Sequence, residues 1–254
     1  MLCALLSAGS LTLPYHIEHY EKGSTSKIDK ICQIVASLPT ATGSAYGLCD
    51  SWFTCKKIIE AHFKKGYHLI GGLKTNRIIY PQGIRTSIKN FAAYIAQNDV
   101  HLVTVNRQSY WVYRYEGALN DIDNAVVLFC WPKDALLNPK ALRTFLCTDM
   151  ALDTETILKY YSRRWPIETF FRQTKGNLGI NQYQIRTITG IKRFWSLTAL
   201  TYLFCTIGSR KKQSFADGLH DMRKNFKKNL FVWIYEQAKS NIPLSQVLHS
   251  LKSA

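Results

Sequence analysis

The chain has 254 residues, long enough for one large domain or two small ones, and its 46% apolar composition excludes global disorder. The formal net charge is +16, and most of it lies late in the chain. Residues 151–254 hold 17 basic and 6 acidic residues (+11), whereas residues 1–150 hold 16 and 11 (+5). This excess favours nucleic acid as a partner, because neutralised phosphates release counterions. The alternative is a basic protein with no nucleic-acid role.

The seven cysteines are scattered and never spaced C-x-x-C, which argues against a disulfide framework or a zinc site and for a reducing cytosol. The sequence contains no run of about 18 apolar residues, the length that a membrane-spanning helix requires. We therefore expect no membrane partner and a cytoplasmic location. The chain begins inside strand-like sequence, which predicts an N-terminal truncation.

The first 72 residues alternate between strand and helix patterns. Residues 2–20 predict one or two strands with a turn near Gly9. Apolar spacing then predicts a helix at 26–38, a strand at 45–49 that ends in Asp50, a helix at 53–65 and a strand at 67–71. This order favours a mixed sheet with helices on its faces.

From residue 73 to 148 the pattern becomes β-rich. Short runs of β-branched and aromatic residues recur between polar or Gly/Pro breaks, at 78–80, 101–105, 110–115, 125–131 and 144–147. The segment is too long for a connection inside a compact domain, so we predict an inserted subdomain.

After Asp149 the chain turns helical. We expect helices at 154–164 and 166–176, with Pro166 restarting or kinking the second one, a buried helix at 190–209 and a helix within 219–240. The last of these carries the basic cluster Arg223, Lys224, Lys227 and Lys228.

One stretch carries the most chemistry, at residues 160–175. On a helix, Glu168, Arg172 and Lys175 lie on one side, away from the apolar stripe that contains Phe170. A carboxylate there can hold a divalent metal while the cations bind phosphate oxygens. The alternative is a solvated face on which Glu168 pairs weakly with Arg164 or Arg172.

The spacing Tyr161-x2-Arg164-x3-Glu168-x6-Lys175 resembles the Tyr-Arg-Glu-Lys signature of bacterial DDE-type insertion-sequence transposases of the IS-four type. Further similar segments are Leu178-Gly179-Ile180, Leu48-Cys49-Asp50-Ser51-Trp52-Phe53 and Leu73-Lys74-Thr75-Asn76-Arg77, so the resemblance covers residues 5–205.

The resemblance implies an α/β fold. It has an RNase H-like catalytic core, a β-rich insertion between the second and third acidic residues, and a helical C-terminal part. The corresponding parts of this chain are 1–72 for the first part of the core, 73–148 for the insertion, 149–210 for the second part of the core and 211–254 for the basic C-terminal region.

The resemblance also implies the chemistry. Asp50 and Glu168 would be catalytic carboxylates that bind Mg²⁺ or Mn²⁺; the alternative for Asp50 is capping of the 53–65 helix. Double-stranded DNA, at the transposon ends and the target, would be the partner of a homodimer associated with the nucleoid. The DNA contacts would be Tyr161, Arg164, Arg172, Lys175, Lys74 and Arg77.

Two tryptophans near these segments have open roles. Trp165, together with Ile167, is expected to pack against other residues, and Trp111 either packs across strands or stacks on an unpaired base.

The family's first aspartate has no counterpart here. It would lie upstream of Met1, and Asp29, the candidate between the opening strands and Asp50, falls in the predicted 26–38 helix. We therefore expect these 254 residues alone to cleave DNA weakly or not at all, and an upstream segment with its aspartate to restore cleavage. Two alternatives stay open: a catalytically inactive DNA-binding remnant of a decayed transposase, and a different RNase H-like nuclease.

Overall fold

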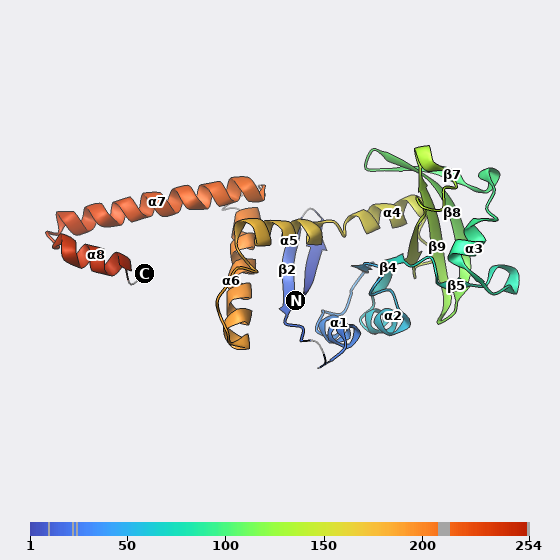
Figure 1. Cartoon of the computed structure of the whole chain (residues 1–254), viewed down its shortest axis with the longest axis horizontal. Coiled ribbons are helices and arrows are strands. Elements are labelled where there is room, and N and C mark those ends of the chain that lie inside the picture. The colour runs from blue at the N-terminus through green and yellow to red at the C-terminus, as the bar shows by residue number, and fades with distance from the viewer. Residues whose placement is uncertain (10, 22, 24, 208–213, 253–254) are drawn as a thin grey trace. The chain divides into compact units, whose positions relative to one another are not determined.

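A computed structural model describes residues 1–9, 11–21, 23, 25–207 and 214–252 (Figure 1). The chain forms two compact units. The first comprises Met1–Ala4 and Glu18–Glu168, and the second comprises Leu5–Ile17 and Thr169–Ala254.

An eight-stranded sheet forms the first unit. Its strand order is β3-β4-β10-β9-β8-β5-β6, with β7 paired to β8. The strands are β3 (Tyr46–Cys49), β4 (His68–Leu73), β5 (Ile78–Ile79), β6 (Thr86–Ser87), β7 (His101–Val105), β8 (Gln108–Leu119), β9 (Ile122–Pro132) and β10 (Arg143–Cys147). β3 runs parallel to β4, and β10 runs antiparallel to both β4 and β9.

Helices cover both faces of this sheet. They are α1 (Lys27–Ala36), α2 (Lys56–Phe63), α3 (Ile88–Ala92) and α4 (Thr154–Ser162). On one face Phe129 of β9 belongs to a cluster with Ile58 of α2, and on the other Leu128 belongs to a cluster with Ile157 of α4. Because side chains alternate along a strand and both faces are covered, residues 125–131 of β9 are buried without interruption.

Sequence-local capping sets the starts of the helices. Ser26 precedes α1, and its Oγ accepts a hydrogen bond of 3.0 Å from the Asp29 N–H. Asp153 precedes α4, and its Oδ1 accepts one of 2.9 Å from the Thr156 N–H. These bonds satisfy backbone donors that a first helical turn leaves unpaired.

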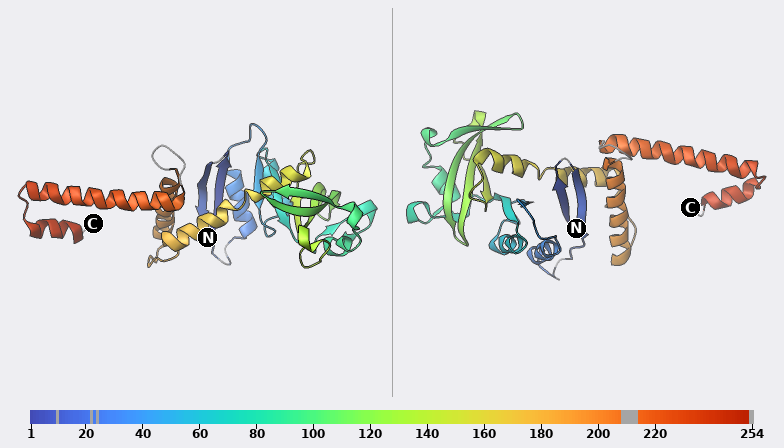
Figure 2. Two further views of the ribbon diagram at one scale, coloured as in Figure 1. Left: turned by 90° about the horizontal axis from the view of Figure 1, so that it is seen from above. Right: turned by 180° about the vertical axis from the view of Figure 1, so that it is seen from behind.

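The second unit is mainly helical. β1 (Leu2–Ala8) and β2 (Leu11–Glu18) pair in a two-stranded sheet, and β1 contributes residues to both units. α5 (Pro166–Asn177) begins in the first unit and continues in the second; it is followed by α6 (Ile188–Ile207), α7 (Phe215–Lys239) and α8 (Leu244–Lys252). α8 turns back along α7, as two views agree (Figures 1 and 2). Within the described ranges, no helix has the length and apolar character needed to cross a bilayer.

The element types predicted from the sequence are confirmed for the two opening strands and for all the long helices. The chain between residues 73 and 148 is β-rich as expected, although the short α3 was missed. Its strands continue the sheet that β3 and β4 begin, because β10 pairs with both β4 and β9. The division at residues 72, 148 and 210 stays a prediction, and residues 211–213 lie outside the described ranges.

Candidate active site

Asp50 directly follows β3, at the carboxyl end of that strand, as the sequence predicted. Its Oδ1 accepts a hydrogen bond of 2.8 Å from the Trp52 N–H, and its backbone oxygen accepts one of 3.1 Å from the Phe53 N–H. The residue is exposed. The alternative role as a helix cap is wrong, because α2 begins at Lys56 and its capping position is Cys55. Asp50 is therefore a solvent-facing carboxylate in a tight turn.

Gly72 of β4 lets two segments meet beside this turn. A Cβ atom at position 72 would lie 3.1 Å from the Ser51 nitrogen and 3.2 Å from the Tyr161 hydroxyl oxygen. Those separations are tighter than ordinary side-chain contacts, so glycine permits the approach. The Tyr161 hydroxyl of α4 thus lies over the same strand residue as the chain that follows Asp50.

Tyr161 is held by packing and remains neutral. Its ring lies 4.6 Å from the Phe145 ring, centroid to centroid. Burial raises the pKa of its hydroxyl, and the neighbouring Arg164 opposes that shift. At neutral pH the hydroxyl keeps its proton and can donate a hydrogen bond to a phosphate oxygen.

Arg164 connects Tyr161 to Glu168. Residues 163–165 form a turn between α4 and α5, which confirms that Pro166 restarts the helix. The Arg164 guanidinium lies 5.7 Å from the Tyr161 ring centroid, and its Nη2 pairs with Glu168 Oε1. Its Nε is a buried donor that has no hydrogen-bond partner among the residues that the structure describes. The alternative of a solvated face also predicted this ion pair. Among the described residues, the pair uses Oε1 of Glu168.

The other predicted DNA contacts differ in their surroundings. Lys74 is exposed, with its ammonium 4.9 Å from the Trp52 ring centroid. Arg77 forms an ion pair with Asp121, so a phosphate would compete with that carboxylate. Arg172 and Lys175 are exposed on α5 in the second unit, four and seven residues beyond Glu168 along the helix.

Two further carboxylates are engaged elsewhere. Asp149 accepts a hydrogen bond of 2.8 Å from the Tyr46 hydroxyl, at the end of β3 opposite Asp50. Asp29 lies in the first turn of α1, as predicted, and pairs with Lys57. In the described part of the chain, no group of three or more His, Cys, Asp or Glu residues is arranged to hold a metal ion.

The expectations for two tryptophans are also decided. The packing role expected for Trp165 is wrong, because its side chain is 59% exposed. Trp111 pairs across strands with Trp131, and its Nε1 donates to the Lys133 carbonyl oxygen at 3.3 Å, which supports packing. No local pattern pointed to Gly72 or to the exposed Trp52, although the sequence does place this tryptophan two residues after the strand-end Asp50.

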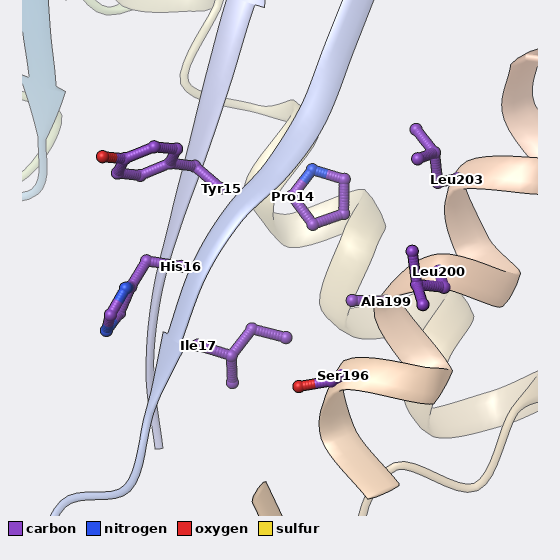
Figure 3. A pocket seen from close by; sticks show the side chains of 8 residues that line it. All are labelled: Pro14, Tyr15, His16, Ile17, Ser196, Ala199, Leu200 and Leu203. Atoms are coloured by element: carbon purple, nitrogen blue, oxygen red, sulfur yellow. The ribbon is translucent and has the colours of Figure 1, made fainter. Parts of the chain in front are cut away.

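An apolar groove in the second unit contains none of these residues. It has a volume of about 280 Å³ and lies between β2 and α6 (Figure 3). Its lining comes from Pro14, Tyr15, His16, Ile17, Ser196, Ala199, Leu200 and Leu203. The lining residues include no carboxylate, whereas Asp50 and Glu168 lie in the first unit.

A family model described as "Transposase DDE domain" matches residues 2–204. The chain belongs to this family. A search of curated proteins finds no match. The match covers most of the chain and includes Asp50, Tyr161, Arg164 and Glu168, and the mixed α/β architecture is consistent with the RNase H-like fold. α7 and α8 lie beyond the matched residues.

Proposed function

We propose that this DDE domain serves metal-dependent DNA cleavage and strand transfer of an insertion sequence, with Asp50 and Glu168 as two of the metal-binding carboxylates. The observation that carries the proposal is the array Tyr161–Arg164–Glu168, whose tyrosine hydroxyl meets the Asp50–Ser51 turn over Gly72. A phosphodiester bound there would meet a carboxylate, a guanidinium and a neutral hydroxyl.

The donor set fits a hard divalent cation. Mg²⁺ takes oxygen ligands and is commonly held by one or two carboxylates, with water and substrate phosphate completing its shell. The hydrogen bonds of Asp50 and Glu168 use one carboxylate oxygen each. When bound, Mg²⁺ or Mn²⁺ would stabilise the negative charge that develops on the phosphate.

The chain's own residues bind and orient the DNA in this proposal. Arg164, whose side chain is 23% exposed, neutralises phosphate charge. The protonated Tyr161 hydroxyl donates to a second phosphate oxygen. Lys74 is an exposed cation of the first unit that would contact the DNA backbone. The exposed Arg172 and Lys175 belong to the second unit and are proposed as further backbone contacts. Arg77 contributes if phosphate displaces Asp121.

Metal binding is the most direct test, because it depends on the two carboxylates themselves. Calorimetry with Mn²⁺ should give a binding isotherm that Asp50→Asn and Glu168→Gln each weaken by about 10-fold or more, since the amide keeps the shape and loses the charge. Asp123→Asn changes an exposed carboxylate on β9 and serves as the matched control. Equal Mn²⁺ affinity in all four proteins would refute the site.

Cleavage tests the chemistry separately. On a duplex that carries the element's own ends, any Mn²⁺-dependent strand cleavage should disappear in both Asp50→Asn and Glu168→Gln. Strand cleavage that persists in both variants would contradict the assignment. Sedimentation with and without this duplex would test the proposed homodimer on DNA.

A second candidate function is DNA binding without catalysis, as in a remnant of a decayed element. The observation in its favour is the exposed basic side of α7, whose four cations Arg223, Lys224, Lys227 and Lys228 form no ion pair among the described residues. This function predicts salt-dependent duplex binding that Asp50→Asn leaves unchanged, with no cleavage in either metal.

A further inference from the structure

Trp52 is an exposed indole in the turn that contains Asp50. Its side chain is 67% exposed, whereas tryptophan normally buries much of its large apolar surface. Its backbone N–H is fixed by the 2.8 Å hydrogen bond to Asp50 Oδ1. The turn therefore holds the indole next to a proposed metal ligand and leaves most of the ring open to solvent.

Two lysines flank the ring. The Lys74 ammonium lies 4.9 Å and the Lys27 ammonium 5.7 Å from the Trp52 ring centroid, and Lys27 also lies 5.1 Å from the ring of Tyr20. Both lysines are exposed, and neither forms an ion pair among the residues that the structure describes. The alternative is a purely structural role, in which the indole packs against the aliphatic parts of the two lysines. Such packing leaves Trp52 67% exposed, so most of the residue remains available to a ligand.

We propose that Trp52 stacks on an unpaired DNA base while Lys27 and Lys74 hold the phosphates of that nucleotide. An aromatic face accepts any base, and flanking cations supply the charge that a single strand requires. A paired base inside a duplex is already stacked on both sides, so the ligand is an unpaired nucleotide. The inference rests on the proposed function, because Asp50 then sets the scissile phosphate beside this nucleotide.

The test compares two labelled DNAs by fluorescence anisotropy without divalent metal: a blunt duplex, and the same duplex with a short single-stranded overhang. Trp52→Ala should weaken overhang binding by about 5- to 150-fold, the range for loss of one stacked base, and leave blunt-duplex binding unchanged. Trp52→Phe keeps an aromatic face and should retain most of the affinity. Tyr94→Ala removes another exposed aromatic ring, one that is 83% exposed, and should match the wild type.

Lys27→Gln and Lys74→Gln should each reduce the slope of log affinity against log salt by about 1 on the overhang DNA, as expected for one lost phosphate contact. Equal losses of blunt and overhang binding in Trp52→Ala, or no loss in either, would overturn the proposal. So would a loss in Trp52→Phe as large as in Trp52→Ala. Because the assay contains no metal and measures no cleavage, a failure of the Asp50–Glu168 metal site would leave its outcome unaffected.

Discussion

The sheet of the first unit and helix α7 of the second differ in how much of their side-chain surface is buried. In β9 the seven residues from Ala125 to Trp131 are at most 2% exposed. In α7, which has 25 residues, the buried ones are Phe215 and Gly218. The sheet positions its residues by packing, whereas the middle of α7 depends on helical hydrogen bonds and presents side chains to solvent. Substitutions in the sheet should therefore change stability, and substitutions on α7 should change binding.

The largest expected effect is a loss of stability on substitution in the buried strand β9. Phe129→Ala removes a fully buried ring from β9 and should lower the free energy of unfolding by about 3–5 kcal/mol. Phe226→Ala removes the same side chain from α7, where it is 71% exposed, and should change it by about 0.5 kcal/mol or less. Chemical denaturation of both variants measures the difference. Similar losses in the two would mean that α7 is packed in solution.

The next largest effect is on DNA binding by the exposed helix α7. We consider the variant in which glutamine replaces Arg223, Lys224, Lys227 and Lys228. Its slope of log affinity for duplex DNA against log salt should be smaller in magnitude by about 3–4. Between 50 and 200 mM salt, the variant should therefore lose about 10²-fold less affinity than the wild type. These side chains lie within two turns on one side of α7. Replacing the exposed Arg85, Lys89, Lys133 and Lys140 makes the same change in net charge and should have a smaller effect. Equal effects of the two fourfold replacements would mean that α7 contributes to DNA binding through the overall net charge alone.

A smaller effect probes packing within the first unit. A Cβ atom added to Gly47 of β3 would lie 2.2 Å from Nε2 of His62, whose side chain is buried. Gly47→Ala should therefore cost about 1–3 kcal/mol of stability through overpacking. Gly43→Ala is the matched control, because its Cβ would meet no atom of the described residues within 4 Å. Denaturation midpoints that fall equally in both variants would contradict this close packing.

The smallest effect is a pH dependence from the same histidine. Burial lowers the pKa of His62 from 6.5, and the hydrogen bond between Nδ1 and the Ile58 carbonyl opposes that shift. As pH falls below 6.5, the unfolded chain takes up a proton that the folded chain does not, so stability declines until the pH reaches the folded pKa. His62→Gln should reduce this decline, because it removes the buried imidazole. Unfolding curves between pH 7 and pH 5 would reveal it.

The sequence by itself predicted features set by neighbours along the chain. The apolar spacing of the predicted helices depends on residues three or four apart, and α1 and α4 formed as predicted. The strand that ends in Asp50 and the helix restart at Pro166 were predicted for the same reason. The spacing of Tyr161, Arg164 and Glu168 likewise carried the resemblance to the family that the matched residues then established.

Only the tertiary structure decided which distant residues meet. Gly72 approaches Tyr161, 89 positions away, because β4 lies between β3 and β10 in the sheet, and no local pattern encodes that pairing. The pairing of Arg77 with Asp121 and the open face of Trp52 beside Lys74 have the same origin. Side-chain type fixes what chemistry a residue can perform. Strand order and close approach determine which of those side chains lie together, because such contacts depend on the packing of the whole sheet.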